Sequence, residues 1–263
     1  MATFENDGVT LAFDDNGASG TPAFVFVHGW TCNRSFFAPQ FDHFGRAHRA
    51  VAMDLRGHGE STPAKNGDYA VATFAADVAA LIEHLDIAPA VVVGHSLGGV
   101  ITCAVSAARP DLVAAAVMVD PAPFVIRDEL RPVIDALFKE IASKDGEAAR
   151  ARMVGGMFLA TDDAERKAWI VNTMAQVPQE IAAPSIGGLL TFDGPRALAS
   201  VQCPIASISA NGPVDDARLM KKANPRLLVG QTLGAGHFNQ LEVPDQVNDM
   251  IGHFLAINGL AKR

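Results

Sequence analysis

The pentapeptide Gly94-His95-Ser96-Leu97-Gly98 has the residue types and spacing of a nucleophile elbow. It follows the apolar run Ala90–Val93, which is typical of a buried strand, and it precedes Gly99-Val100, which opens a helical pattern. A serine in a sharp turn between such a strand and a helix presents its hydroxyl at the carboxyl edge of a sheet. The pattern therefore predicts that Ser96 is the nucleophile of a covalent mechanism, rather than a plain helix-capping serine.

A serine hydroxyl needs a base to take its proton, and the candidate is His237. This residue lies in Gly234-Ala235-Gly236-His237-Phe238, a loop of small residues between the last predicted strand and the last predicted helix. Because such a loop at the sheet edge can reach Ser96, we predict that His237 is the base. Three other histidines, His28, His58 and His95, lie in tight turns, where hydrogen bonds to the backbone are their expected role.

Short apolar strands alternate with helices along much of the chain, and these elements must position the two residues. The predicted strands are Val9–Phe13, Phe24–Val27, Ala50–Met53, Ala90–Val93, Ala115–Val119, Ile205–Ile208 and Leu227–Val229. Several are continuous Val/Ile/Ala runs, as expected for strands covered on both faces of a parallel sheet. Helices are predicted over Thr73–Leu85 with a capping Thr73, from Ser96 to before Pro110, and over Pro244–Ile257. This alternation predicts an α/β fold with a doubly wound, mostly parallel sheet.

Between Phe124 and about Arg196 the strand pattern stops and helices are predicted instead. They fall around Arg131–Ser143, Gly146–Met157, Asp162–Val177 and Pro184–Phe192. Because this segment is too long for a loop, we predict a helical cap inserted between two strands of the sheet. The predicted division is a core of residues 1–122 and 197–263 and a cap of residues 123–196.

The chain resembles the α/β-hydrolase fold superfamily over essentially its whole length. The motifs that carry the resemblance are Phe26-Val27-His28-Gly29-Trp30, Asp54-Leu55-Arg56-Gly57-His58-Gly59-Glu60-Ser61, the Ser96 pentapeptide, and Gly236-His237 followed by Glu242-Val243-Pro244. The resemblance points to the capped, serine esterase or lactonase branch, with a Ser–acid–His triad and an oxyanion hole of two backbone N–H groups. By position in that superfamily, these donors would be the amides of Trp30 and Leu97.

The same resemblance implies a substrate pocket under the cap and a structural role for the Asp54–Ser61 loop. We expect the pocket to be lined by His28, Phe124, Met157, Trp169 and Phe238. Cys32 is expected to be a buried thiol near the pocket mouth. In the loop, Arg56 is expected to form a buried arginine–aspartate arrangement.

The triad acid departs from the usual pattern of the superfamily. In most relatives it follows the strand after the cap, where this sequence has Ser207–Pro213 and no carboxylate, with Asp215 a few residues later. Asp120 instead ends the strand before the cap, a position that some branches use. We favour Asp120 as the acid that orients the His237 imidazole, with Asp215 as the alternative.

Composition excludes several classes of protein. The chain has 263 residues, of which 49% are hydrophobic and 19% charged, a balance that builds a sizeable core rather than a disordered chain. The net charge is −8 and no basic stripe is present, so a nucleic-acid partner is not expected. The longest apolar run, Leu112–Val119, is far shorter than the ~20 residues that span a bilayer, so no membrane partner is expected.

Cysteine usage and the N-terminal sequence suggest a cytoplasmic setting. Cys32, Cys103 and Cys203 are far apart in the sequence, and no cysteine–histidine cluster has metal-ligand spacing. The start of the sequence, MATFENDGVT, lacks the pattern of a secretory signal. We therefore expect a cytoplasmic enzyme that needs no metal and no organic cofactor and acts on a small molecule. The sequence leaves open a homodimer.

The preferred function is hydrolysis of a small hydrophobic carboxylic ester or lactone through an acyl-enzyme. One alternative is a cofactor-independent dioxygenase of a hydroxylated N-heterocycle, which this chain resembles at Gly29-Trp30, Arg56-Gly57-His58-Gly59 and Asp120 but not at Leu97. In that reaction His237 would deprotonate the ring and Ser96 would only bind it. A second alternative is a non-catalytic small-molecule receptor that retains the triad.

Overall fold

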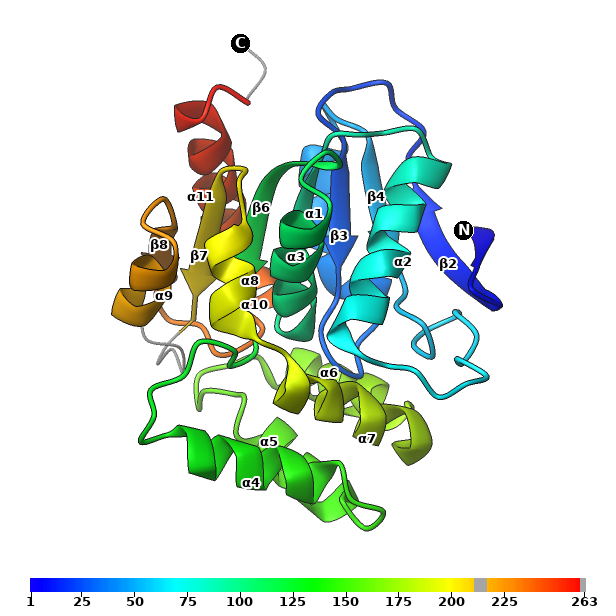
Figure 1. Cartoon of the computed structure of the whole chain (residues 1–263), viewed down its shortest axis with the longest axis vertical. Coiled ribbons are helices and arrows are strands. Elements are labelled where there is room, and N and C mark those ends of the chain that lie inside the picture. The colour runs from blue at the N-terminus through cyan, green and yellow to red at the C-terminus, as the bar shows by residue number, and fades with distance from the viewer. Residues whose placement is uncertain (211–216, 261–263) are drawn as a thin grey trace.

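The computed structural model describes residues 1–210 and 217–260, and these contain an eight-stranded sheet with the order β1-β2-β4-β3-β5-β6-β7-β8 (Figure 1). The strands are β1 (Ala2–Asn6), β2 (Val9–Asp15), β3 (Phe24–Val27), β4 (Ala50–Met53), β5 (Ala90–His95), β6 (Val113–Val119), β7 (Ile205–Ser209) and β8 (Leu228–Gln231). Strand β2 pairs antiparallel with β1 and β4, whereas the other pairs are parallel. The predicted α/β class with a mostly parallel sheet is confirmed.

The central strands end at one common edge, which is where the candidate catalytic residues lie. Every residue of β3, β4, β5 and β7 is buried, because helices cover both faces of this part of the sheet. In the register, His95 at the end of β5 is opposite Val119, and Val119 is opposite Ile208 of β7. The residues that follow β5 and β6, Ser96 and Asp120, are therefore neighbours at the carboxyl edge.

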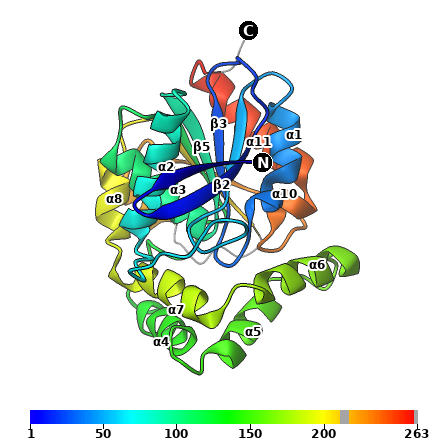
Figure 2. The same cartoon turned by 90° about the vertical axis from the view of Figure 1, so that its right-hand side faces the viewer.

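Two layers of helices enclose the sheet (Figure 2). Helices α1 (Ala38–Phe44) and α11 (Pro244–Ile257) cover the face where Phe24 and Phe26 pack. Helices α2 (Val71–His84), α3 (Leu97–Ala108) and α8 (Gly194–Ser200) cover the face that carries Val25 and Val27. The short helices α9 (Ala217–Ala223) and α10 (Asn239–Glu242) complete the core. No helix of the described ranges is long and apolar enough to cross a membrane.

Of the five helices between β6 and β7 in the sequence, the first four sit across the carboxyl edge of the sheet (Figures 1 and 2). They are α4 (Arg131–Ile141), α5 (Glu147–Gly155), α6 (Ala164–Ala175) and α7 (Gln179–Gly187), followed by the 3-10 turns of Gly188–Thr191. We call α4–α7 with their connections the helical insertion. The next helix, α8, already packs beside α3 of the core.

Three local predictions differ from the structure for identifiable reasons. β1 was not predicted, because its half-exposed pattern lacks a continuous apolar run. Thr73 does not cap α2, which begins at Val71; its hydroxyl donates instead to Asp68 Oδ2 at 2.7 Å. The helix predicted from Pro184 begins earlier, at Gln179, and tolerates Pro184 inside it.

Arg56 forms the buried arginine–aspartate arrangement that the sequence suggested, with Asp77 of α2 as its partner. The Nε donates to Asp77 Oδ2 at 2.6 Å, and Nη2 donates to Asp77 Oδ1 at 2.8 Å. Both side chains are almost fully buried, at 1% and 0% exposure. A paired, bidentate geometry satisfies charges that would otherwise be costly to bury.

Removing one partner of this pair is expected to destabilise the fold. Asp77→Ala removes the buried partner of the Arg56 guanidinium and leaves only the exposed Asp7, 3.8 Å away, so the free energy of unfolding should fall by about 3–5 kcal/mol. Urea unfolding followed by circular dichroism measures this. Asp111→Ala, which breaks an exposed pair with Arg109, is the control and should leave the midpoint unchanged. Equal effects of the two substitutions would contradict the assignment.

Candidate active site

Ser96 occupies a strained turn between β5 and α3. Its backbone angles are φ 54° and ψ −119°, in a region that non-glycine residues rarely adopt and that strained functional sites often use. Its N–H donates to Val119 O at 3.0 Å, which ties the turn to the end of β6. Ser96 is therefore held at the carboxyl edge of the sheet, as a nucleophile elbow requires.

The two glycines that flank the elbow allow its chain segments to approach closely. A Cβ at position 94 would lie 2.0 Å from the carbonyl oxygen of Gly98, and a Cβ at position 98 would lie 2.0 Å from Val27 O. Both contacts are with backbone atoms, which cannot move aside as a flexible side chain can. The spacing of glycines in the motif thus has a direct steric cause.

Gly94→Ala is expected to displace the elbow and impair turnover. A shift of the nucleophile by about 1 Å can cost ~10²-fold in rate, so kcat should fall by at least that order. The matched control is Gly252→Ala on α11, where an added Cβ has nothing within 4 Å. Turnover measurements on both variants check this expectation, which fails if Gly94→Ala turns over as fast as the control.

Asp120 and His237 form a hydrogen bond across the same edge. His237 Nδ1–H donates to Asp120 Oδ2 at 2.6 Å, and the other carboxylate oxygen accepts the Ala210 N–H at 2.7 Å. The hydrogen bond by which an acid orients a histidine ring is thus present between Asp120 and His237. Asp215, the alternative acid, lies outside the described residues.

The His237 main chain is held from two sides. Its N–H donates to Met157 O of the helical insertion at 2.9 Å, and its carbonyl accepts the Nε2–H of His95 at 2.8 Å. With Nδ1–H bonded to Asp120, the free basic nitrogen of the ring is Nε2. Ser96, Asp120 and His237 all line one cavity of about 390 Å³.

The amides of Trp30 and Leu97 have no hydrogen-bond partner within residues 1–210 and 217–260. Leu97 is the first residue of α3, where backbone N–H groups lack intrahelical acceptors. The Gly29 carbonyl, which shares a peptide unit with the Trp30 N–H, accepts His28 Nδ1–H at 2.8 Å and Cys32 N–H at 3.1 Å. Because the two groups of a trans peptide point in opposite directions, these bonds fix the direction of the Trp30 amide.

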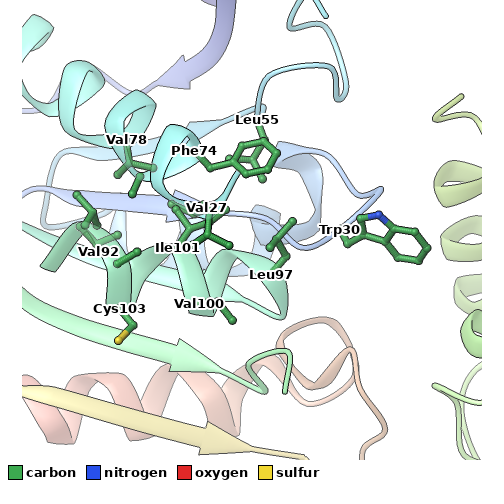
Figure 3. Close-up of a cluster of buried hydrophobic side chains, with 14 of the residues drawn as sticks. Val27, Trp30, Leu55, Phe74, Val78, Val92, Leu97, Val100, Ile101 and Cys103 are labelled. Carbon is green, nitrogen blue, oxygen red and sulfur yellow. The ribbon is translucent and has the colours of Figure 1, made fainter. Parts of the chain in front are cut away.

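The side chain of Trp30 connects the core to the insertion. Figure 3 shows it pointing away from the buried core residues and toward the inserted helices. Its Nε1–H donates to Ala182 O of α7 at 2.8 Å, and the Arg150 guanidinium of α5 lies 5.6 Å from the ring centre. A cation over an indole face is a favourable contact, so both helices hold this ring in place.

The cavity is mostly apolar and is lined from both the core and the insertion. Core residues on its wall include Trp30, Cys32, Leu97, Ala122 and Phe238. The insertion adds Met153, Met157, Phe158, Leu159, Ile186 and Leu189. A concave, mostly apolar space of this size with a few polar groups on one wall is typical of a small-molecule site.

Two of the five predicted pocket residues, Met157 and Phe238, line this cavity, and the prediction for the other three is corrected. His28 is fully buried, with its Nε2 accepting the Leu55 N–H and its Nδ1–H donating to Gly29 O. Phe124 is buried against the start of α8, and Trp169 is 40% exposed with its ring on Phe36. Beside the predicted Met157, its neighbours Phe158 and Leu159 and residues of the inserted helices such as Leu137 and Ile186 form the wall.

The three buried histidines near the motifs act as uncharged backbone partners. Burial lowers the pKa of His28 to about 4 and that of His58 to about 3, and it lowers the pKa of His95 well below its ordinary value. Each donates one ring N–H to a main-chain carbonyl. The acceptors are Gly29, Arg56 and His237, respectively. Hydrogen bonding to the backbone, as the tight turns predicted, is their role here.

Cys32 lines the cavity but is poorly suited to nucleophilic chemistry. Burial raises the pKa of its thiol far above the ordinary value, so the thiolate is disfavoured. Within the described residues, no three His, Cys, Asp or Glu side chains group as ligands for a metal ion.

The α/β hydrolase fold family matches residues 22–198, and the chain belongs to this family. Its fold, with helices inserted over the carboxyl edge of the sheet, fits the capped branch of this family. It is similar to the enol-lactonase of Burkholderia xenovorans LB400, with a TM-score of 0.83 and 23% identity over 97% of this chain and all of that one. The thermophilic esterase of Thermogutta terrifontis gives a TM-score of 0.80 and 22% identity over 97% and 96% of the two chains.

Sequence relatives have several activities on this fold. Lipase LipV of Mycobacterium tuberculosis is 31% identical over 67% of this chain and 74% of its own. A bifunctional esterase/perhydrolase of Acinetobacter calcoaceticus is 38% identical over 51% and 49%, and a non-heme chloroperoxidase of Streptomyces lividans is 39% identical over 46% and 44%. The chain thus spans about half the length of the last two. These relatives support an enzyme of the hydrolase class.

Proposed function

We propose that the protein is a serine hydrolase that cleaves a small hydrophobic carboxylic ester or lactone through an acyl-enzyme. One observation carries the proposal: the strained Ser96, the Asp120–His237 hydrogen bond and two unoccupied backbone amides all belong to the walls of one apolar cavity. Nucleophile, base and anion-binding donors are the three parts that acyl transfer needs.

The first half of the reaction forms the acyl-enzyme. Ser96 Oγ attacks the ester carbonyl carbon while His237 Nε2 takes the hydroxyl proton. Asp120 holds the imidazole in the required tautomer and stabilises the imidazolium. The developing oxyanion accepts hydrogen bonds from the Trp30 and Leu97 amides, each worth roughly 10²–10³ in rate.

The second half releases the acid. The imidazolium gives its proton to the leaving alkoxide, which departs as an alcohol or, for a lactone, stays tethered to the acyl chain. Water then attacks the acyl carbonyl, with His237 again taking a proton, and the carboxylic acid leaves while Ser96 regains its hydrogen. The protein's own groups balance every proton in this cycle.

The cavity favours a modest apolar substrate. Its volume of about 390 Å³ and its wall of methionine, leucine, isoleucine and phenylalanine side chains suit a short acyl chain or a compact ring. Methionine side chains are adaptable, so we expect tolerance of several acyl shapes rather than a single substrate.

A panel of p-nitrophenyl esters of graded chain length, together with lactones, tests the proposal. Turnover that is fastest for short acyl chains, with a fluorophosphonate adduct on the Ser96 peptide detected by mass spectrometry, is the expected result. A hydroxyquinolone with an oxygen electrode tests the dioxygenase alternative, which gives oxygen uptake that the phosphonate does not stop. Stabilisation by these compounds without turnover of any of them would indicate the receptor alternative.

A second candidate activity follows from the identity to an esterase/perhydrolase. In it, hydrogen peroxide replaces water as the nucleophile toward the same acyl-enzyme, and the product is a peroxyacid. The test adds hydrogen peroxide to the best ester and measures peroxyacid formation against hydrolysis. An absence of peroxyacid under saturating peroxide would exclude this activity while leaving the hydrolase proposal intact.

A further inference from the structure

Two carboxyl groups outside the triad meet beside the His237 loop. Glu242 is the last residue of α10, and its Oε2 accepts the N–H of Gly236, the residue before His237, at 2.8 Å. Asp162 belongs to the helical insertion, where its Oδ2 accepts the Leu159 N–H at 2.7 Å. Both carboxyl groups border Gly236, because a Cβ added to this residue would lie 3.1 Å from Asp162 Oδ2 while its N–H bonds to Glu242.

The insertion rests directly on the His237 loop at this point. Besides the bond from His237 N–H to Met157 O, a Cβ at position 236 would lie 2.7 Å from Met157 O and 3.1 Å from Asp162 Oδ2. Only a glycine fits such an approach without displacing the insertion. The same insertion segment, 157–159, forms part of the cavity wall. The carboxyl pair therefore joins the base-bearing loop to a wall of the pocket.

This pair can be hydrogen-bonded only if it holds a proton, since two carboxylates have no donor between them. Burial and the neighbouring Asp162 raise the pKa of Glu242 from its ordinary 4.5 to about 7, while Arg166 of α6 acts in the opposite direction. The second oxygen of Glu242, Oε1, is buried and accepts no hydrogen bond from the described residues. An O–H at this position facing Asp162 would satisfy it.

We propose that Asp162 and Glu242 share one proton and so form a clasp that fastens the helical insertion to the His237 loop, with Glu242 acting as a positioning residue for His237. The clasp rests on the positions of the two carboxyl groups beside Gly236 and not on the proposed activity. Its kinetic consequence for His237 rests on the proposed function.

The sign of the pH effect follows from the direction of the shift. The closed clasp keeps the Glu242 proton up to about pH 7, whereas an opened clasp releases it near 4.5. Opening therefore becomes easier as pH rises between these values and levels off above about 7. Between pH 6 and 8.5 the opening equilibrium of the clasp should therefore increase about tenfold.

Hydrogen exchange with mass spectrometry tests the clasp directly. Peptides covering residues 157–162 and 234–242 are compared at pH 6 and 8.5 after correction for the intrinsic exchange rate. The wild type should lose about tenfold protection at the higher pH. Glu242→Gln, whose amide donates to Asp162 and accepts from Gly236 without titrating, should lose none. Asp162→Asn, in which Glu242 stays buried and still titrates but has no carboxyl partner, should lose less protection than the wild type.

The matched control is Asp163→Asn, which removes one negative charge at the residue next to Asp162. Asp163 accepts the Arg166 N–H at the start of α6, so its exchange should match the wild type at both pH values. If Glu242→Gln shows the same pH-dependent loss as the wild type, the shared proton is refuted. This readout needs no turnover, so it separates failure of the clasp from failure of the proposed hydrolase.

Kinetics test the positioning role. Glu242→Ala removes the acceptor of the Gly236 N–H and should lower kcat by about 10- to 100-fold with a smaller change in KM. Glu242→Gln should rescue kcat. The ratio of its kcat to that of the wild type should rise between pH 6 and 7, where the wild-type clasp loosens, and stay constant at higher pH. Equal kcat for the alanine and glutamine variants at all pH values would overturn the positioning role.

Discussion

Ser96→Ala is expected to abolish ester turnover while leaving the fold intact. Without the hydroxyl no acyl-enzyme can form, and loss of a triad serine reduces kcat by roughly 10⁴- to 10⁶-fold. The substitution keeps the Cβ and removes a single oxygen at the cavity wall, so packing of β5 and α3 is preserved. Steady-state hydrolysis of the best p-nitrophenyl ester, with thermal unfolding alongside, measures both effects.

The control for this variant is Ser106→Ala on the same helix. Ser106 is buried and its hydroxyl donates to Thr102 O at 2.7 Å, far along α3 from the elbow. We expect it to retain the wild-type rate. Substantial hydrolysis by Ser96→Ala, in protein free of wild-type contamination, would rule out the covalent mechanism and favour a reaction in which the serine only binds.

Asp120→Asn is expected to reduce kcat by about 10⁴-fold with little change in KM. The carboxylate accepts the His237 Nδ1–H at 2.6 Å, whereas an amide can present its NH₂ group there and favour the wrong imidazole tautomer. Because the Ala210 N–H can still donate to the amide oxygen, the strand end should keep its geometry. Stopped assays over a range of substrate concentrations separate kcat from KM.

Asp215→Asn is the comparison for this variant, since Asp215 is the alternative acid on sequence grounds. We expect its kcat to match that of the wild type. A large loss in Asp215→Asn together with a mild effect in Asp120→Asn would reverse the assignment of the acid, even though Asp120 contacts His237 in the structure.

Backbone strain at the ends of β5 and β6 supports the catalytic roles proposed for Ser96 and Asp120. Ser96 has φ 54° and Asp120 has φ 38°, so each has a conformation that a non-glycine residue adopts at a cost. Each is anchored to the next strand, Ser96 by its N–H to Val119 O and Asp120 by its N–H to Ile208 O. The rigid parallel sheet thus holds two unfavourable turns in place, and those turns present the hydroxyl and the carboxylate toward the cavity.

The sequence by itself determined the features that depend on local chain geometry. A buried apolar run followed by Gly94–Gly98 identifies the elbow. Glycine is required at both ends because the chain segments of this turn pack so closely that a Cβ would overlap backbone atoms. The end of a strand places Asp120 at the carboxyl edge, since parallel strands share one direction. The small-residue loop around His237 follows the last strand for the same reason. These are short-range patterns that need no knowledge of distant partners.

Tertiary structure alone decided which side chains meet across the cavity. Helical periodicity indicates that one face of each inserted helix is buried, but not whether that face meets the sheet, another helix or the pocket. Trp169 and Phe124 accordingly pack elsewhere, while the non-helical 157–159 segment forms part of the wall. The Asp162–Glu242 pair joins residues 80 positions apart in the sequence. Such contacts depend on how the helical insertion is placed on the sheet, and no local pattern encodes that placement.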